Sequence, residues 1–193
     1  MPRTEVFDRQ LVLDRAKDVF WQKGYNGTSM QDLVDATGLN RSSIYNSFGN
    51  KRALYNAALE KYKDETDTFF EACDCTTLTG LQVVQSIFSN VIESIESDTE
   101  NKGCMVMNCA TELSGKDRKL DKWLRGSLDE TTDKIEEYVL KGQKDGSIRK
   151  DESSRALADY LVAGLHGLRI TSLSNKDKEM LKGIANKIVT SIQ

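Results

Sequence analysis

Proline is nearly absent from this sequence, and the only one stands at position 2 of 193 residues. Because proline removes a backbone N–H and interrupts helices, its absence elsewhere permits long helical segments. Residue patterns that bound strands and form turns are also scarce. We therefore expect an all-α fold.

Histidine and cysteine are scarce as well. The chain has one histidine, His166, and four cysteines whose C-x-C and C-x4-C spacings match no common zinc pattern. Those cysteines are Cys73, Cys75, Cys104 and Cys109. The first ten residues, MPRTEVFDRQ, are polar, so we expect no export signal and reduced thiols. Neither a metal site nor a cofactor is expected.

The sequence patterns of enzymes and membrane proteins are missing too. The sequence contains no nucleophile elbow, no phosphate-binding loop and no paired metal ligands from which a catalytic site could be built. It has no run of about 18 apolar residues that could span a membrane. Charged residues make up 30% of the chain, with a net charge of −3. We expect a soluble, cytoplasmic protein that is not an enzyme.

Charge is distributed unevenly along the chain. Residues 1–62 contain nine Lys or Arg against seven Asp or Glu, whereas the remaining residues are net acidic. A slightly basic N-terminal part allows contact with nucleic acid without requiring it.

Apolar residues recur at helical spacing through most of the chain and predict about nine helices. The expected ranges are 8–23, 29–38, 40–48, 51–72, 78–97, 101–114, 117–143, 152–173 and 176–191.

The second and third of these helices have the pattern of a helix-turn-helix. Ser29 can cap the first of the pair, with Asp32 in place of the glutamate of a capping box, and Gly38 ends it. Asn40 can cap the next helix, and Asn50 the long one after it. Two short helices joined by a glycine-containing turn can place the second helix in the major groove of DNA.

The outward residues of that second helix are polar: Arg41, Ser42, Ser43, Tyr45 and Asn46. Arg can pair with guanine, Asn with adenine, and Ser with a base or a phosphate. Thr28 and Lys51 stand at the helix starts on either side, in position for phosphate contacts. A helical interaction protein that does not bind DNA remains an alternative, because short polar helices are often only solvated.

The run VLDRAKDVFWQKGYNGTSMQDLVDATGLNRSSIYNSFGNKRALYNAAL resembles the N-terminal domain of the TetR/AcrR family of bacterial transcriptional regulators. The spacing holds without a gap over about 48 residues. The matching positions are Ala16, Phe20, Gly24, Tyr25, Thr28, Ser29, Asp32, Ala36, Gly38, Ile44, Tyr45, Phe48, Lys51, Leu54 and Leu59. Gly49 departs from the pattern, since the family often has proline there, and the capping role passes to Asn50.

The resemblance implies a DNA-binding domain at residues 1–50 and an effector-binding and dimerisation domain at residues 51–193, connected by helix 51–72. Family members are usually homodimers that bind palindromic operators and release them when a small molecule binds. The partners expected by this resemblance are duplex DNA, a small-molecule effector and a second copy of the chain, with no membrane. A repressor is expected because most members repress.

The same resemblance assigns roles to the residues of the helix-turn-helix. Tyr45, Lys51 and Thr28 would contact backbone phosphates. The groove would be faced by Arg41, Ser42, Ser43 and Asn46.

The segment KGCMVMNCATEL, residues 102–113, resembles the start of the sixth helix in one branch of the family. Cys104 then has two interpretations. It is either a sensor thiol activated by a helix N-terminus and by Lys102, which would make the protein an electrophile- or redox-responsive regulator, or an inert buried cysteine.

The effector pocket is expected between the fourth and the eighth of the predicted helices, 51–72 to 152–173, and its candidate residues favour an apolar or aromatic effector. These candidates, each of which could instead be ordinary core, are Phe69, Phe88, Met105, Met107, Cys109, Trp123, Leu124, Tyr138, Tyr160 and His166. In the family, the last two helices pair with their copies in the dimer. The candidates for that interface are Leu161, Leu165, Leu168, Leu181, Ile184 and Ile188.

Overall fold

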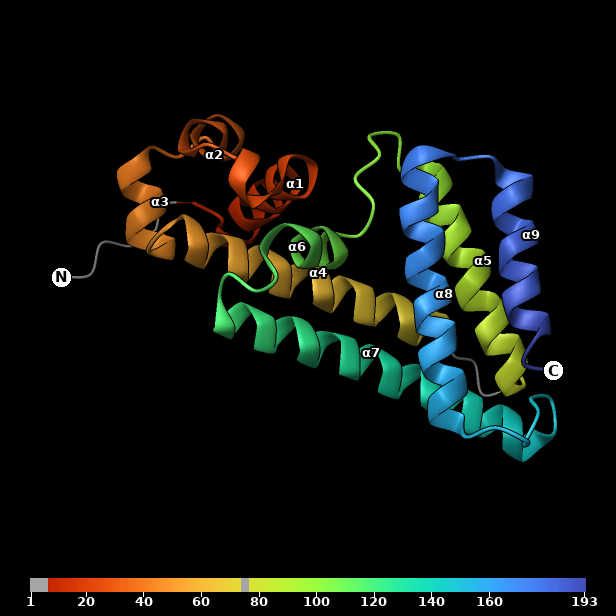
Figure 1. Cartoon of the computed structure of the whole chain (residues 1–193). Helices are drawn as coiled ribbons and strands as arrows, with labels where there is room; N and C mark the ends of the chain where they lie inside the picture. Colours follow the sequence, from red (N-terminus) through yellow and green to blue (C-terminus); the bar gives the residue numbers. More distant parts are fainter. Residues whose placement is uncertain (1–6, 74–76) are drawn as a thin grey trace. The chain divides into compact units, whose positions relative to one another are not determined.

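The computed structural model describes residues 7–73 and 77–193, which form nine helices and no strand (Figure 1). This confirms the all-α prediction. The helices are α1 (Arg9–Gly27), α2 (Met30–Thr37), α3 (Arg41–Phe48), α4 (Lys51–Cys73), α5 (Gly80–Ser97), α6 (Met105–Leu113), α7 (Arg118–Asp145), α8 (Ser154–Ser174) and α9 (Lys178–Thr190).

Contacts within the chain divide it into two compact units. The N-terminal unit holds residues 7–65 together with Cys104–Ser114, and the C-terminal unit holds the remaining described residues. The long helix α4 therefore runs from one unit into the other. Helix α6 belongs to the N-terminal unit, although it follows α5 in the sequence.

The N-terminal unit is built around the apolar stripe of α1. Val12, Ala16 and Phe20 of that stripe are buried. The Phe20 ring meets the ring of Tyr55 on α4 edge to face, with centroids 5.0 Å apart. The apolar face of α1 is thus the face that packs.

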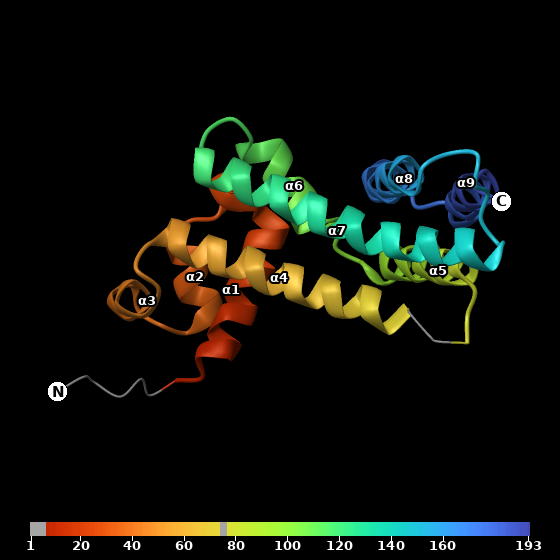
Figure 2. The same ribbon diagram turned by 90° about the horizontal axis from the view of Figure 1, so that it is seen from below.

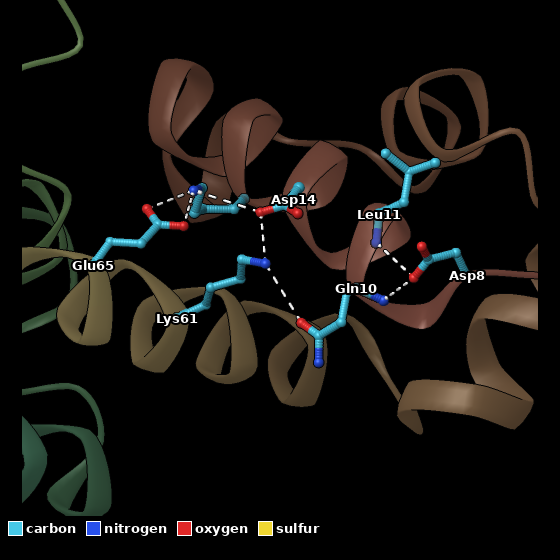
Figure 3. Close-up of polar contacts among 7 residues, drawn as sticks. Asp8, Gln10, Leu11, Asp14, Lys61 and Glu65 are labelled. Atoms are coloured by element: carbon cyan, nitrogen blue, oxygen red, sulfur yellow. Dashed lines mark hydrogen bonds and ion pairs between the residues drawn. The ribbon is translucent and has the colours of Figure 1, made fainter. Parts of the chain in front are cut away.

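A polar cluster also joins α1 to α4 within this unit (Figure 3). The ammonium of Lys17, which is only 8% exposed, lies 2.6 and 2.7 Å from the two carboxylate oxygens of Glu65. Lys61 lies 2.8 Å from an Asp14 carboxylate oxygen and donates a longer hydrogen bond to Gln10. A buried ammonium needs such partners, and the cluster links the two helices.

The C-terminal unit packs α5, α7, α8 and α9 around one apolar core, and Figure 2 shows α8 and α9 side by side and nearly end on. The start of α5 approaches α7 closely. A Cβ on Gly80 would lie 2.1 Å from the backbone nitrogen of Gly142, so no larger residue fits there.

One predicted helix begins later than expected. The sequence suggested a start at residue 101, but α6 begins at Met105. Asn101 and Gly103 both have left-handed φ angles, 56° and 66°, which no α-helix accommodates. The carboxylate of Asp98 accepts a hydrogen bond from the Gly103 N–H at 3.0 Å and stabilises this loop.

Candidate nucleic-acid interface

Helix α2 begins with the capping box that the sequence predicted. The Asp32 N–H donates to the Ser29 hydroxyl at 3.1 Å, and the Ser29 N–H donates to the Asp32 carboxylate at 2.7 Å. Lys23 pairs with the same carboxylate at 2.5 Å. Hydrogen bonds from Lys23 and then Ser29 hold the pKa of Asp32 well below its ordinary value.

The turn between α2 and α3 depends on Gly38. Its φ of 72° lies in the left-handed region, and its N–H donates to the Val34 carbonyl at 2.9 Å. This is the usual way in which a glycine ends a helix. Asn40 then caps α3, because its side-chain oxygen accepts the Ser43 N–H at 2.8 Å. Both caps were predicted from the sequence.

Helix α3 is held to the unit by one apolar face. Ile44 and Phe48 are buried. The guanidinium of Arg9 lies 4.3 Å from the Phe48 ring centroid and donates to the Ser47 carbonyl at 2.7 Å. A cation at the C-terminus of a helix is favourable. Sequence reasoning missed Arg9, since nothing local links it to a helix some 38 residues away.

The opposite face of α3 is polar and open to solvent. Arg41, Ser42 and Asn46 are exposed, and Tyr45 is 43% exposed. Ser43 is half-buried, and its N–H donates to the side chain of Asn40. A short helix that is anchored on one side and presents Arg, Ser, Tyr and Asn on the other suits the major groove.

Lys51 stands at the start of α4, after an Asn50 cap that accepts the Ala53 N–H at 2.9 Å. Its ammonium lies 4.5 Å from the centroid of the Tyr25 ring. Burial lowers the pKa of Lys51, while the charges of Glu112 and Asp32 oppose that shift. Lys51 is half-buried and close to the helix-turn-helix.

Thr28 does not have the position that was predicted for it. The residue is only 1% exposed, and its hydroxyl donates to the Gly24 carbonyl at 2.7 Å. A buried hydroxyl cannot reach a phosphate. Thr28 instead stabilises the turn between α1 and α2.

A carboxylate from α6 completes the same turn. The two oxygens of Glu112 accept the N–H groups of Tyr25 and Asn26 at 2.8 and 2.6 Å. Sequence reasoning missed this residue. A lone glutamate near a helix end carries no signal that it binds a turn 86 residues earlier.

The predicted effector-pocket residues are scattered over both units. Met105 and Cys109 are buried in the N-terminal unit with the half-buried Met107. In the C-terminal unit Phe88 and Tyr138 are buried in the core, whereas Tyr160 is exposed. The remaining four are half-buried: Phe69, Trp123, Leu124 and His166.

A surface cavity of about 340 Å³ lies along the first half of α7. Its lining consists of Arg118, Asp121, Lys122 and Arg125. No predicted pocket residue takes part in this lining, and its charged character differs from the apolar pocket that was expected.

All four predicted interface leucines point into their own chain. Leu161, Leu165, Leu168 and Leu181 belong to the buried core of the C-terminal unit, so they have no surface to offer a partner. Ile184 is exposed and Ile188 is half-buried. The large apolar side chains that α8 and α9 do expose are Tyr160, Ile170, Leu173 and Ile184.

The cysteines differ in exposure. Cys73 and Cys109 are buried, and burial is the main cause of a raised pKa for the Cys109 thiol. Cys104 is half-buried at the N-cap of α6 and makes no side-chain capping bond. Cys75 lies outside the described residues. Within the described ranges, no group of three or more His, Cys, Asp or Glu is placed to hold a metal ion.

The helix-turn-helix, its exposed polar face and the second helical unit define a DNA-binding transcriptional regulator. Residues 12–58 match the tetR family of bacterial regulatory proteins, and residues 80–188 match the tetracyclin repressor-like C-terminal domain. The chain therefore belongs to the TetR family. None of its described helices is both long and apolar enough to cross a membrane.

Individual relatives agree with this assignment. The chain is 31% identical over 95% of its length to the HTH-type transcriptional repressor ComR of Escherichia coli, covering 88% of that protein. It is 27% identical over 94% of its length to the repressor DhaR of Mycobacterium sp., covering 89% of that protein. A cysteine mutant of the regulator CifR, solved with 26-bp double-strand operator DNA, superposes with a TM-score of 0.86 at 25% identity, covering 97% of this chain and 98% of that one.

Proposed function

We propose that this protein represses transcription by binding a palindromic operator as a homodimer, and that a small molecule releases it. The exposed polar face of α3 carries the proposal, since the capped, anchored helix leaves Arg41, Tyr45 and Asn46 for an outside partner. The names of ComR and DhaR describe repressors, and CifR was solved on operator DNA, which supports the same role here.

The geometry suggests how the contacts are shared. Residues on the exposed face of α3 would reach base edges in the major groove, with Arg41 for guanine and Asn46 for adenine. The Tyr45 hydroxyl and the Lys51 ammonium would bind phosphates on either side and set the register.

A homodimer is supported by the surface of α8. Tyr160, Ala163, Gly167 and Ile170 are all exposed and lie at helical spacing on one face. A Cβ on Gly167 would have no neighbour within 4 Å outside the adjoining backbone of its own helix, so the middle of this face has room for a partner helix to approach closely. Exposed apolar side chains flanking small residues are typical of a helix-pairing surface.

The effector is proposed to act through the C-terminal unit, with the predicted pocket residues that lie there, among them Phe88 and Tyr138, as its first candidates. Cys104 offers a second route to release, because it is half-buried rather than fully buried. Cys104→Ser treated with an electrophile distinguishes the two. Unchanged release from DNA in that variant contradicts a sensor thiol and leaves the effector pocket.

The proposed function is tested by selecting duplexes from a random-sequence pool with the purified protein. We expect enrichment of an inverted repeat, because a two-fold dimer presents two copies of α3. Failure to enrich any sequence, at low as well as moderate salt, contradicts operator binding. Such a result would favour a helical protein that interacts with partners other than DNA.

A further inference from the structure

The turn that leads into α2 is tied down from two sides. Gly24 has a φ of 71°, so the helical path of α1 breaks at this residue. Its carbonyl accepts the Thr28 hydroxyl, while the next two N–H groups, of Tyr25 and Asn26, donate to the carboxylate of Glu112. Ser29, which caps α2, follows three residues after Asn26. The position of this turn therefore sets where α2 begins.

The carboxylate is fitted closely to this backbone. A Cβ on Gly24 would lie 2.8 Å from one Glu112 oxygen, so the carboxylate occupies the space that a glycine leaves. Each oxygen takes one N–H, an arrangement that needs both oxygens to be acceptors. Hydrogen bonds from N–H to an ionised carboxylate are stronger than those to a neutral group.

The same turn also contains Tyr25, whose ring lies under the ammonium of Lys51. Tyr25 packs on Tyr55 with ring centroids 5.0 Å apart, and Lys51 and Arg52 both lie over its face. A displaced turn would therefore shift the support of a proposed phosphate contact as well as the start of α2. Glu112 itself lies on α6, which contributes no residue to the polar face of α3.

We propose that Glu112 is a positioning residue for DNA binding: its carboxylate holds the turn at residues 24–26 and through it orients α2, α3 and Lys51. This inference rests on the proposed function, since it assigns a role within operator binding. It makes a prediction opposite in sign to simple electrostatics. Removing a negative charge should strengthen attraction to DNA, whereas loss of positioning should weaken operator binding.

The test compares Glu112→Gln, Glu112→Ala and the wild type on the duplex that the wild type selects from a random pool. Glutamine keeps the size but has one acceptor, and its NH₂ would face an N–H donor. We expect Glu112→Ala to bind this duplex about tenfold or more weakly, the equivalent of one lost charge-assisted hydrogen bond, and Glu112→Gln to fall between it and the wild type. Thr111→Ala is the matched control, because Thr111 is exposed on the same helix and its hydroxyl only reaches Asn108 of that helix.

Two further readouts separate positioning from general stability. The amides of Tyr25 and Asn26 should exchange hydrogen faster in both Glu112 variants, while binding to a scrambled duplex at low salt should be unchanged or tighter. Operator affinity equal to or above that of the wild type overturns the proposal. If Glu112→Ala does not fold, the operator affinity of Glu112→Gln is the deciding measurement. If the wild type selects no sequence at all, the proposed function itself fails. If it selects one and the variants bind it equally well, only the role of Glu112 fails.

Discussion

The ammonium of Lys51 lies 4.5 Å from the centroid of the Tyr25 ring, so the first residue of α4 rests on the turn that precedes α2. Arg52 lies over the same ring at 4.4 Å. A tyrosine that faces two cations stabilises both of them, and it also limits where they can point. The cations next to α3 are thus held by the fold and do not depend on DNA for their position.

Replacement of Tyr45 and Lys51 together by alanine should abolish operator binding and leave the fold intact. Both residues are proposed to bind phosphates, and neither belongs to the fully buried core. A mobility-shift titration measures the affinity, and circular dichroism checks the helices. Lys119→Ala, which removes an exposed lysine from α7, is the control for lost charge. Wild-type affinity in the double variant would contradict the assignment.

Asn40→Ala should destabilise the N-terminal unit by about 1 kcal/mol, the usual effect of losing an N-cap. The Ser43 N–H would lose its side-chain partner at the start of α3. Asn40→Ser can restore the cap and should recover most of the loss. Urea unfolding measures both variants. Equal stability of the alanine and serine variants would show that the cap contributes nothing.

Asp32 should make the stability of the N-terminal unit depend on pH in the acid range. Its pKa is lowered from the ordinary value of 3.8 by hydrogen bonds from Lys23 and Ser29. A lowered pKa means that the contribution is present above the unfolded-state pKa and is lost as the pH falls through the folded-state pKa. Asp32→Asn should therefore be less stable than the wild type at neutral pH, with the difference shrinking below pH 3.8.

Unfolding of the wild type, Asp32→Asn and Asp35→Asn over that pH range checks this expectation. Asp35 lies on the same helix and accepts a hydrogen bond from Gln31. A stability difference for Asp32→Asn that stays constant with pH would mean that the carboxylate charge is not what matters.

Ile170→Glu should break the proposed homodimer. Ile170 is 44% exposed on the apolar face of α8, and a carboxylate buried between two chains lacks a partner. Leu128→Glu is a matched control, since Leu128 is 46% exposed on α7. Light scattering should give half the mass for Ile170→Glu and an unchanged mass for the control. A dimer in both variants would place the interface elsewhere.

Local features of the helix-turn-helix could be predicted from sequence because their causes are local. Ser29, Gly38 and Asn40 act on backbone groups within four residues, and the structure confirms each cap. Ile44 and Phe48 are spaced so that both lie on one side of α3. When this side packs against the unit, the opposite side of the helix stays exposed.

Features that depend on distant packing could not be predicted in this way. The leucines of α8 form an apolar stripe, but a stripe does not tell whether its neighbour is the same chain or a second copy. Thr28 was assigned from a motif, and its burial depends on the turn at Gly24. The Tyr25 N–H in that turn donates to the carboxylate of Glu112, which lies far along the chain.

The most direct test of DNA reading by α3 is a parallel selection with the wild type and with Arg41→Ala/Asn46→Ala. Each good base contact discriminates by about 1–3 kcal/mol. We predict that the variant loses the preference at specific positions, symmetric in the two half-sites, while the half-site spacing stays the same. Selection of the same sequence with the same affinity by both proteins would contradict the claim that the exposed face of α3 reads the operator.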